Sequence, residues 1–265
     1  MVQFTQTNRR RYTQPFTRTA STRNRLSLRL PKVRINWLVV VVVLAVIVGG
    51  WYVFGSGHFR ITNVIISGSL NDSISKELES LKGKNIVTLS VRQFELQLPK
   101  RQSSLKALHI VKGFPDTLKI DISVREPALI WKSGDNKYYI DGDGVIFTLD
   151  GMQTTVDDSK LAIVNDTRNQ PVDLGRHLVS KNFVAFISQL ASSFHEKSGV
   201  SITGMGVGET TRFVDVSTDA SITVKLDATR TLDPQLASLA LILNQYRADI
   251  HQYVDLRVEG RAFYQ

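Results

Sequence analysis

A long apolar run lies near the N-terminus of the chain. Residues 37–54 read WLVVVVVLAVIVGGWYVF, and no Lys, Arg, Asp or Glu occurs between Arg34 and Arg60. A helix of this length is about 27 Å long, close to the hydrocarbon thickness of a bilayer. The alternative is a buried strand or helix of a soluble core, but core strands seldom exceed about ten residues. The run therefore predicts a membrane-spanning helix within residues 36–57.

Aromatic residues at the ends of the run fit the belts that lie at membrane interfaces. We expect the membrane anchor to include Trp37, Leu38, Val48, Trp51, Tyr52 and Phe54. A cleaved signal peptide is the second interpretation, because Gly55 and Gly57 form a small-x-small pair just after the run. The run is longer than a usual signal-peptide core and a long polar segment precedes it, which favours an uncleaved signal anchor.

C-terminal to the apolar run, the pattern of hydrophobic and polar residues predicts a small β-α-α-β-β unit at residues 58–126. Its expected elements are a strand over 61–68, a helix over 73–83, a helix over 91–98 ended by Pro99, and strands over 108–114 and 117–124. In the last of these, Leu118, Ile120 and Ile122 alternate with Lys119 and Asp121. Such alternation is typical of a strand with one buried face and one solvated face.

The rest of the chain predicts a mixed, mainly antiparallel β domain with flanking helices at residues 127–265. The expected strands cover 128–131, 138–140, 145–149, 200–202, 213–216, 222–226 and a closing stretch over 253–259. One helix is predicted over 180–196, and another begins with Asp233 as its N-cap. Residues 152–176 give no clear pattern. The fold class is therefore α+β, with a single N-terminal transmembrane helix.

The positive charge of the chain is concentrated in its first 35 residues. These residues hold nine Lys and Arg and no acid, although the whole chain has 33 basic against 24 acidic residues. The rest of the chain has equal numbers of basic and acidic residues, so the net positive charge does not indicate a basic folded surface that binds nucleic acid. The tail has a disordered composition, and the positive-inside rule places it in the cytoplasm and the C-terminal part outside. We expect anionic lipid headgroups, and not nucleic acid, as its partner.

No recognisable catalytic, cofactor-binding or metal-binding motif occurs. The chain has no cysteine, and its five histidines never stand at i, i+4 on a predicted helix. Asp141 and Asp143 begin like a calcium loop, but Val145 occupies the next ligand position and the twelfth position is not Glu. A hairpin turn is the better interpretation of this segment. We therefore expect no enzyme and no cofactor, although a catalytic set built from distant residues would escape this reasoning.

Three stretches resemble the bacterial FtsQ/DivIB cell-division family. They are FRITNVIISG at 59–68 with GKNIVTL at 83–89, FPDTLKIDISVREPALIW at 114–131 with YYIDGDGVIF at 138–147, and YVDLR at 253–257. No single stretch is very specific for this family, but the order of the three stretches after a signal anchor is. The resemblance covers roughly residues 60–150 and 230–265.

The resemblance implies a POTRA domain at 58–126 and a β domain at 127–265. It also implies a non-enzymatic scaffold of the division septum in the bacterial cytoplasmic membrane, which joins FtsB/FtsL-type partners and helps to control septal peptidoglycan synthesis. In that family the partner contacts lie around the final strand. They map here to Asp255, Leu256, Arg257, Val258, Gly260, Arg261, Phe263 and Tyr264.

The residue pattern also supports binding of a partner at the final strand. An edge strand presents free N–H and C=O groups to an incoming strand. We expect Val254, Leu256 and Val258 to face the core, which leaves Arg257 to meet a partner. A fully paired final strand is the alternative. Two other functions stay open: a POTRA-bearing envelope assembly or secretion factor, whose many-stranded barrel this chain has no room for, and a membrane-anchored cell-envelope enzyme.

Overall fold

The computed structural model describes residues 36–68, 72–149 and 156–265, and the predicted basic tail at 1–35 lies outside the described residues. The chain divides into two units, Met1–Val48 and Gly49–Gln265. Helix α1 (Trp37–Gly55) has none of its residues buried. By length and composition, α1 is the one helix in the described part that could cross a membrane. The predicted anchor residues from Trp37 to Phe54 all lie on it.

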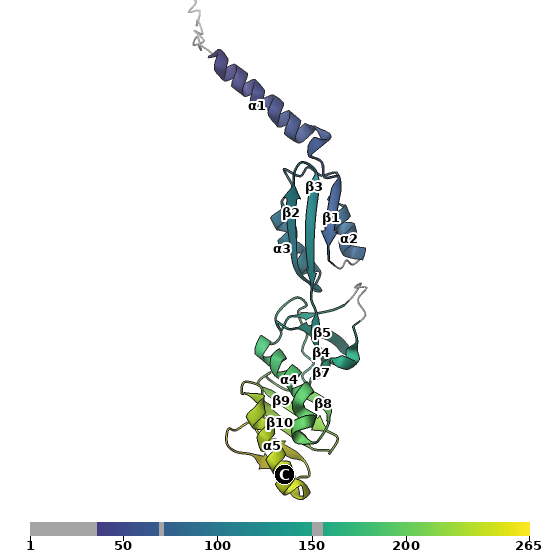
Figure 1. Ribbon diagram of the computed structural model, residues 1–265, viewed down its shortest axis with the longest axis vertical. Helices are drawn as coiled ribbons and strands as arrows, with labels where there is room; N and C mark the ends of the chain where they lie inside the picture. Colours follow the sequence, from purple (N-terminus) through teal and green to yellow (C-terminus); the bar gives the residue numbers. More distant parts are fainter. Residues whose placement is uncertain (1–35, 69–71, 150–155) are drawn as a thin grey trace, which may run out of the picture. The chain divides into compact units, whose positions relative to one another are not determined.

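A three-stranded sheet follows within the second unit. Its elements are β1 (Asn63–Ser67), α2 (Asp72–Glu79), α3 (Val91–Arg101), β2 (Leu105–Gly113) and β3 (Thr117–Val124). Figure 1 shows β3 between β1 and β2, with the two helices on one side of the sheet. β3 runs parallel to β1 and antiparallel to β2. The predicted β-α-α-β-β order is confirmed.

The alternation in β3 decides which face of this sheet is covered. Leu118, Ile120 and Ile122 are buried with residues of both helices in one core, whereas Lys119 and Asp121 are exposed. Because successive side chains of a strand point to opposite faces, this register fixes the apolar face toward the helices. The sheet therefore has one solvated face, as the sequence predicts.

The prediction that Pro99 ends the second helix is wrong. α3 continues through Pro99 to Arg101, and the Gln102 N–H donates to the Leu98 carbonyl at 3.0 Å. Pro99 has no N–H to donate to the carbonyl four residues earlier, but the helix continues for two further residues beyond it. Leu96, which contributes to the apolar pattern of this helix, is 57% exposed and does not join the core.

The larger sheet has nine strands in the order β12-β11-β10-β9-β8-β7-β4-β5-β6. The strands are β4 (Pro127–Ser133), β5 (Asn136–Asp141), β6 (Ile146–Phe147), β7 (Ala162–Asp166), β8 (Ile202–Val207), β9 (Phe213–Thr218), β10 (Thr223–Asp227), β11 (Tyr253–Asp255) and β12 (Phe263–Tyr264). Three neighbouring pairs are parallel and five are antiparallel. The sheet is mixed and mainly antiparallel, as predicted.

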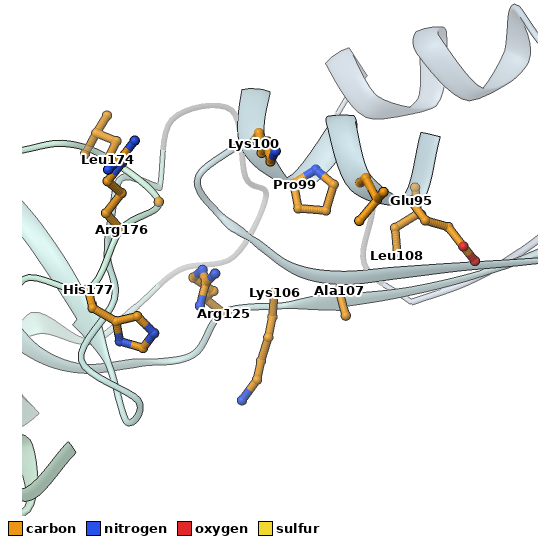
Figure 2. Close-up of a pocket in the computed structure, with 12 residues that line it drawn as sticks. Glu95, Pro99, Lys100, Lys106, Ala107, Leu108, Arg125, Leu174, Arg176 and His177 are labelled. Atoms are coloured by element: carbon orange, nitrogen blue, oxygen red, sulfur yellow. The ribbon is translucent and has the colours of Figure 1, made fainter. Parts of the chain in front are cut away.

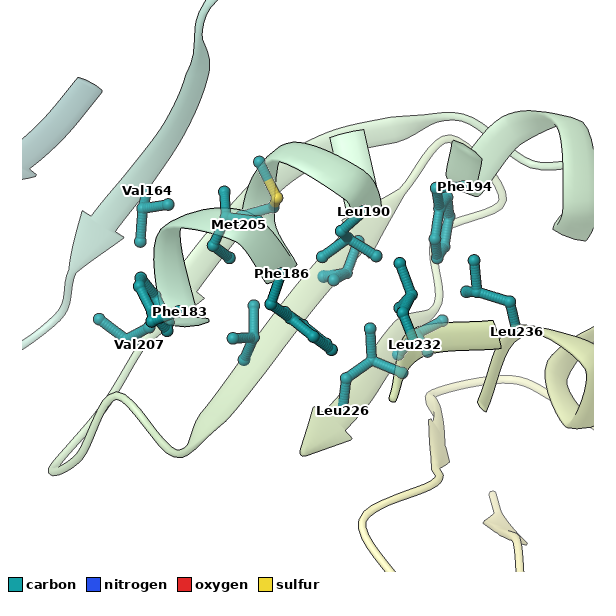
Figure 3. Close-up of a cluster of buried hydrophobic side chains, with 14 of the residues drawn as sticks. Val164, Phe183, Phe186, Leu190, Phe194, Met205, Val207, Leu226, Leu232 and Leu236 are labelled. Carbon is teal, nitrogen blue, oxygen red and sulfur yellow. The ribbon is translucent and has the colours of Figure 1, made fainter. Parts of the chain in front are cut away.

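Two helices, α4 (Lys181–Ser198) and α5 (Leu232–Tyr246), pack against each other and share a core with this sheet. The Ser180 hydroxyl caps α4 by accepting from the Phe183 N–H at 3.1 Å, and Gly199 ends the helix with a φ of 73°. Figure 3 shows Phe186 and Leu190 of α4 among side chains from the strands and α5. The helix predicted over 180–196 is confirmed. The described residues also include three short 3-10 turns: η1 (Gly57–Phe59), η2 (Asp158–Lys160) and η3 (Arg247–Asp249).

Two further differences from the sequence predictions concern the start of α5 and a strand that the sequence pattern does not predict. Asp233 is not the N-cap of α5, because the extended residue before the helix is Thr231 and Asp233 lies in the first turn. Its carboxylate pairs with Lys197 of α4 instead. The unpredicted stretch 152–176 contains β7, which lies between β4 and β8 and runs parallel to both.

Candidate partner interface at the C-terminal edge of the sheet

The candidate interface lies where the closing segment of the chain forms two strands. β11 pairs in parallel with β10 through Val224 and Val254, and β12 returns antiparallel to β11 with Tyr264 opposite Val254. Gly260, with a φ of 68°, lies in the connection between them. β12 is therefore the outermost strand at this edge of the described sheet.

This arrangement corrects the predicted single closing strand over 253–259. Val254 and Leu256 are buried as expected, but Val258 is 50% exposed and lies outside both strands. The alternation ends because β11 stops at Asp255 and the chain turns back toward β12. The outer side of β11 is paired with β12, so β11 is not the free edge.

The backbone of β12 has a defined register. The Gln265 N–H donates to the Tyr253 carbonyl at 3.2 Å, and the Tyr253 N–H donates to the Gln265 carbonyl at 3.3 Å. Residues 253 and 265 thus form a hydrogen-bonded pair of the antiparallel ladder. Because backbone groups alternate in direction along a strand, the N–H and C=O of Tyr264 point away from β11. They form the outward edge of the sheet.

Asp255 and Arg257 form a bidentate ion pair beside this edge. Arg257 Nε lies 2.9 Å from Asp255 Oδ1, and Nη2 lies 2.6 Å from Oδ2. The Arg257 backbone N–H also donates to Oδ1 at 3.0 Å. These hydrogen bonds from Arg257 hold the pKa of Asp255 below its usual range and raise the pKa of Arg257. The charge of Arg257 is therefore largely engaged inside the chain.

Phe213 of β9 brings two guanidinium groups together on the same sheet. The Cζ atoms of Arg257 and Arg212 each lie 5.0 Å from the centroid of its ring. Arg212 also pairs with the buried Asp227 at 3.1 Å. Such cation–π contacts restrain planar arginine side chains. Arg257 is consequently held in place by Asp255 and Phe213 together.

Aromatic side chains remain exposed at the outer strand. Phe263 and Tyr264 are 50% and 40% exposed, and the Tyr264 ring stacks on Tyr246 of α5 with centroids 5.5 Å apart. Exposed aromatic clusters of this kind are common at protein interfaces. Sequence reasoning missed Tyr246 and Phe213, because only the return of β12 and the sheet order bring these residues to the interface.

The eight predicted partner-binding residues fall into three groups by exposure. Leu256 is buried, Asp255 and Arg257 are half-buried, and the exposed ones are Val258, Gly260, Arg261, Phe263 and Tyr264. The structure places all eight in one continuous segment of β11, its turn and β12. The five exposed residues are therefore the most accessible members of this predicted set.

The Asp141–Gly144 segment is a turn whose acidic side chain is engaged internally. Asp141 Oδ1 accepts from the N–H groups of Asp143 and Val145 at 3.0 and 2.9 Å, and Oδ2 pairs with Arg125. Within the described residues, no group of three or more His, Asp or Glu is arranged to hold a metal ion.

Comparison with known proteins supports the resemblance found in the motifs. Residues 129–257 match the family model described as cell division protein FtsQ/DivIB, C-terminal. The chain is 32% identical over 89 residues to the cell division protein FtsQ of Rickettsia bellii (strain RML369-C), covering 32% of this chain and 33% of that protein. It is 27% identical over 130 residues to FtsQ of Streptomyces venezuelae, covering 48% and 47%, and 26% identical over 120 residues to FtsQ of Streptomyces collinus, covering 43% and 46%.

These alignments span between a third and about half of the length of each relative. The family match includes β4 to β11, which hold most of the larger sheet and all of α4 and α5. Residues 129–257 thus form the C-terminal domain of the FtsQ/DivIB family of cell-division proteins.

Proposed function

We propose that the chain is a non-enzymatic, membrane-anchored scaffold of the divisome that joins FtsB/FtsL-type partners and helps to control septal peptidoglycan synthesis. The observation that carries this proposal is the outward backbone edge of β12, flanked by exposed aromatic side chains. Family membership makes the chain a cell-division protein. The edge supplies a physical means by which such a protein binds another chain.

The proposal includes four segments along the chain. They are a cytoplasmic tail at 1–35 resting on anionic lipids, a signal anchor at 36–57, a POTRA domain at 58–126 and a β domain at 127–265. The two separate sheets, each with a buried core of its own, support the boundary near 126. The charge asymmetry before α1 supports an N-terminus in the cytoplasm and a C-terminal part outside the membrane, at the septum.

The binding mechanism is strand addition at β12. A partner strand that pairs with the N–H and C=O of Tyr264 extends the nine-stranded sheet by one strand. Backbone hydrogen bonds supply affinity with little sequence preference, and Phe263, Tyr264 and Val258 add apolar contact. An acidic partner residue near the exposed Arg261 sets the register, because the charge of Arg257 is already paired with Asp255.

Removal of a single backbone donor tests this mechanism. Tyr264→Pro deletes the outward N–H but leaves the hydrogen-bonded pair of Tyr253 and Gln265. We expect the full-length variant in detergent to bind the purified FtsB/FtsL-type complex up to about tenfold more weakly, which is the upper value for the loss of one hydrogen bond. Tyr264→Thr keeps the N–H and strand propensity, so it is the matched control for the lost ring.

The two variants separate the possible outcomes. Weak binding by Tyr264→Pro with nearly normal binding by Tyr264→Thr supports strand addition. Equal loss in both variants assigns the affinity to the tyrosine ring. Undiminished binding by Tyr264→Pro means that the interface lies elsewhere. Division in cells depleted of the native protein gives the corresponding functional readout.

A further inference from the structure

A groove runs between the three-stranded sheet and a loop that precedes α4. Its walls come from α3, from the start of β2 and from residues 174–177, and it encloses about 1070 Å³. Figure 2 shows Pro99 and Leu108 on one side of this space and Leu174 and Arg176 on the other. All of these residues belong to the second unit of the chain.

Two leucines give the groove an apolar lining that the core does not use. Leu96 is 57% exposed and Leu174 is 44% exposed, and both line the groove. Burial of either side chain by a ligand removes apolar surface from water, which is favourable at about 25 cal/mol per Å². Exposed leucines that converge on one hollow from distant segments are typical of an interaction surface.

The rim of the groove is positively charged. Lys100 is exposed and has no ion pair among the residues that the structure describes, and Arg176 makes only an exposed contact of 4.0 Å with Asp173. Glu95 is the one acidic residue in the described lining, and its carboxylate already accepts from the Ile110 N–H at 2.8 Å. An exposed ion pair contributes little, so both cations are available to a ligand.

We propose that this groove docks an acidic, amphipathic segment of a partner protein. Apolar side chains of that segment lie between Leu96 and Leu174, and its carboxylates pair with Lys100 and Arg176. The basic tail of this chain does not fit, because its nine cations would be repelled by the rim. The surface is separate from β12, so it serves a second partner contact and does not depend on strand addition.

A preference of the groove for an acidic ligand must come from the charged residues at the groove itself. Outside the first 35 residues the chain has equal numbers of basic and acidic residues, so its overall charge does not attract such a segment. The tail does attract acidic peptides, and a useful measurement therefore has to report on the groove alone. Because the chain has no cysteine, a single cysteine can be introduced at a chosen position and labelled there alone.

The test uses the full-length chain in detergent with Ala107→Cys, an exposed position in the groove, carrying a small trifluoromethyl label read by ¹⁹F NMR. The probe is a synthetic helical peptide with leucines at i, i+3, i+4 and i+7 and glutamates on its flanks; its counterpart has lysines in place of the glutamates. We expect the acidic peptide to shift the signal at 107 but not that of a label at Ser192→Cys. The lysine peptide should bind at least about tenfold more weakly.

Variants of the lining complete the test. Leu96→Asp and the pair Lys100→Glu with Arg176→Glu should each weaken the acidic peptide about tenfold or more. Leu241→Asp, at an equally exposed leucine on α5, is the matched control and should bind normally. If Leu96→Asp proves unstable, Leu174→Asp in the loop decides. Equal affinity for both peptides, or normal binding by the leucine variants of the groove, overturns the proposal and leaves the test at Tyr264 unaffected.

Discussion

Arg125 and Asp141 form an ion pair that links the two sheets. Arg125 follows β3 and Asp141 ends β5, and Nη1 of the arginine lies 2.5 Å from Oδ2 of the aspartate. Their side chains are 12% and 5% exposed. Arg125 also donates through its backbone N–H to the Ser104 carbonyl at 2.8 Å and through Nε to the Ser103 carbonyl at 3.1 Å. One arginine therefore joins the ends of β3 and β5 to the residues just before β2.

Loss of this arginine should destabilise the chain strongly. Arg125→Met leaves the Asp141 carboxylate buried without its cation, and breaking a buried pair in this way typically costs about 3–5 kcal/mol. Arg125→Met combined with Asp141→Asn removes the orphaned charge and keeps an oxygen for the N–H groups of Asp143 and Val145. Urea unfolding of the full-length variants should show the double variant as more stable than the single one. Equal stability of the two would mean that the pair carries no buried-charge penalty.

The register of β3 gives a second prediction at two adjacent residues. Ile120 is fully buried in the central strand between β1 and β2, whereas Lys119 is exposed on the other face. Ile120→Asp places a charge in the core of the three-stranded sheet and should unfold that sheet. Lys119→Asp introduces the same residue one position earlier, on the exposed face of the strand, and should be tolerated. Limited proteolysis of the full-length chain, followed by mapping of the cleavage sites, distinguishes the two variants; similar resistance in both would contradict the observed register.

Alternating or helical apolar patterns identify the elements that bury one face. Leu118, Ile120 and Ile122 predict β3 with the correct orientation, and Phe183 to Phe194 predict α4 with the correct buried side. These patterns succeed because each element contacts a single core. They fail for β7, a short parallel strand with neighbours on both sides, because its position between β4 and β8 depends on residues far away in sequence.

The candidate site shows the same limit. YVDLR locates the segment of the partner edge, but the sequence does not reveal that β12 covers β11 or that Tyr246 lies against Tyr264. The pattern of Val254, Leu256 and Val258 continues past the end of β11, because exposed apolar residues in a turn imitate strand alternation. Leu96 misleads in the same way, since it lines a surface groove instead of the core. Exposed apolar residues and core residues are indistinguishable in the pattern of a single sequence.

Acid should weaken the edge of the larger sheet through Asp255. Its folded-state pKa is lowered by Arg257, so ionisation of Asp255 stabilises the folded chain above the unfolded pKa of about 3.9. That contribution is lost as the pH falls through the lower, folded-state pKa. Asp255→Asn removes the contribution at every pH. The difference in free energy of unfolding between the original chain and this variant should therefore shrink as the pH falls below about 4.

Urea titrations at several pH values measure this difference. Arg257→Gln is the companion variant, because it removes the cation that lowers the Asp255 pKa and should reduce the acid dependence similarly. A difference that stays constant between pH 6 and about 3 would show that Asp255 is not ionised preferentially in the folded chain.

The orientation of the chain in the membrane can be tested because the chain has no cysteine. Single cysteines at Ser21, before α1, and at Ser192, exposed on α4, report on the two sides of the predicted span. With nine basic residues before α1 and none of opposite sign, we expect Ser21→Cys to stay protected from a membrane-impermeant thiol reagent in spheroplasts and Ser192→Cys to react. Both cysteines should react after detergent lysis, which controls for accessibility. Labelling of Ser21→Cys alone in intact spheroplasts would reverse the proposed topology and place the β12 edge in the cytoplasm, away from any extracytoplasmic partner.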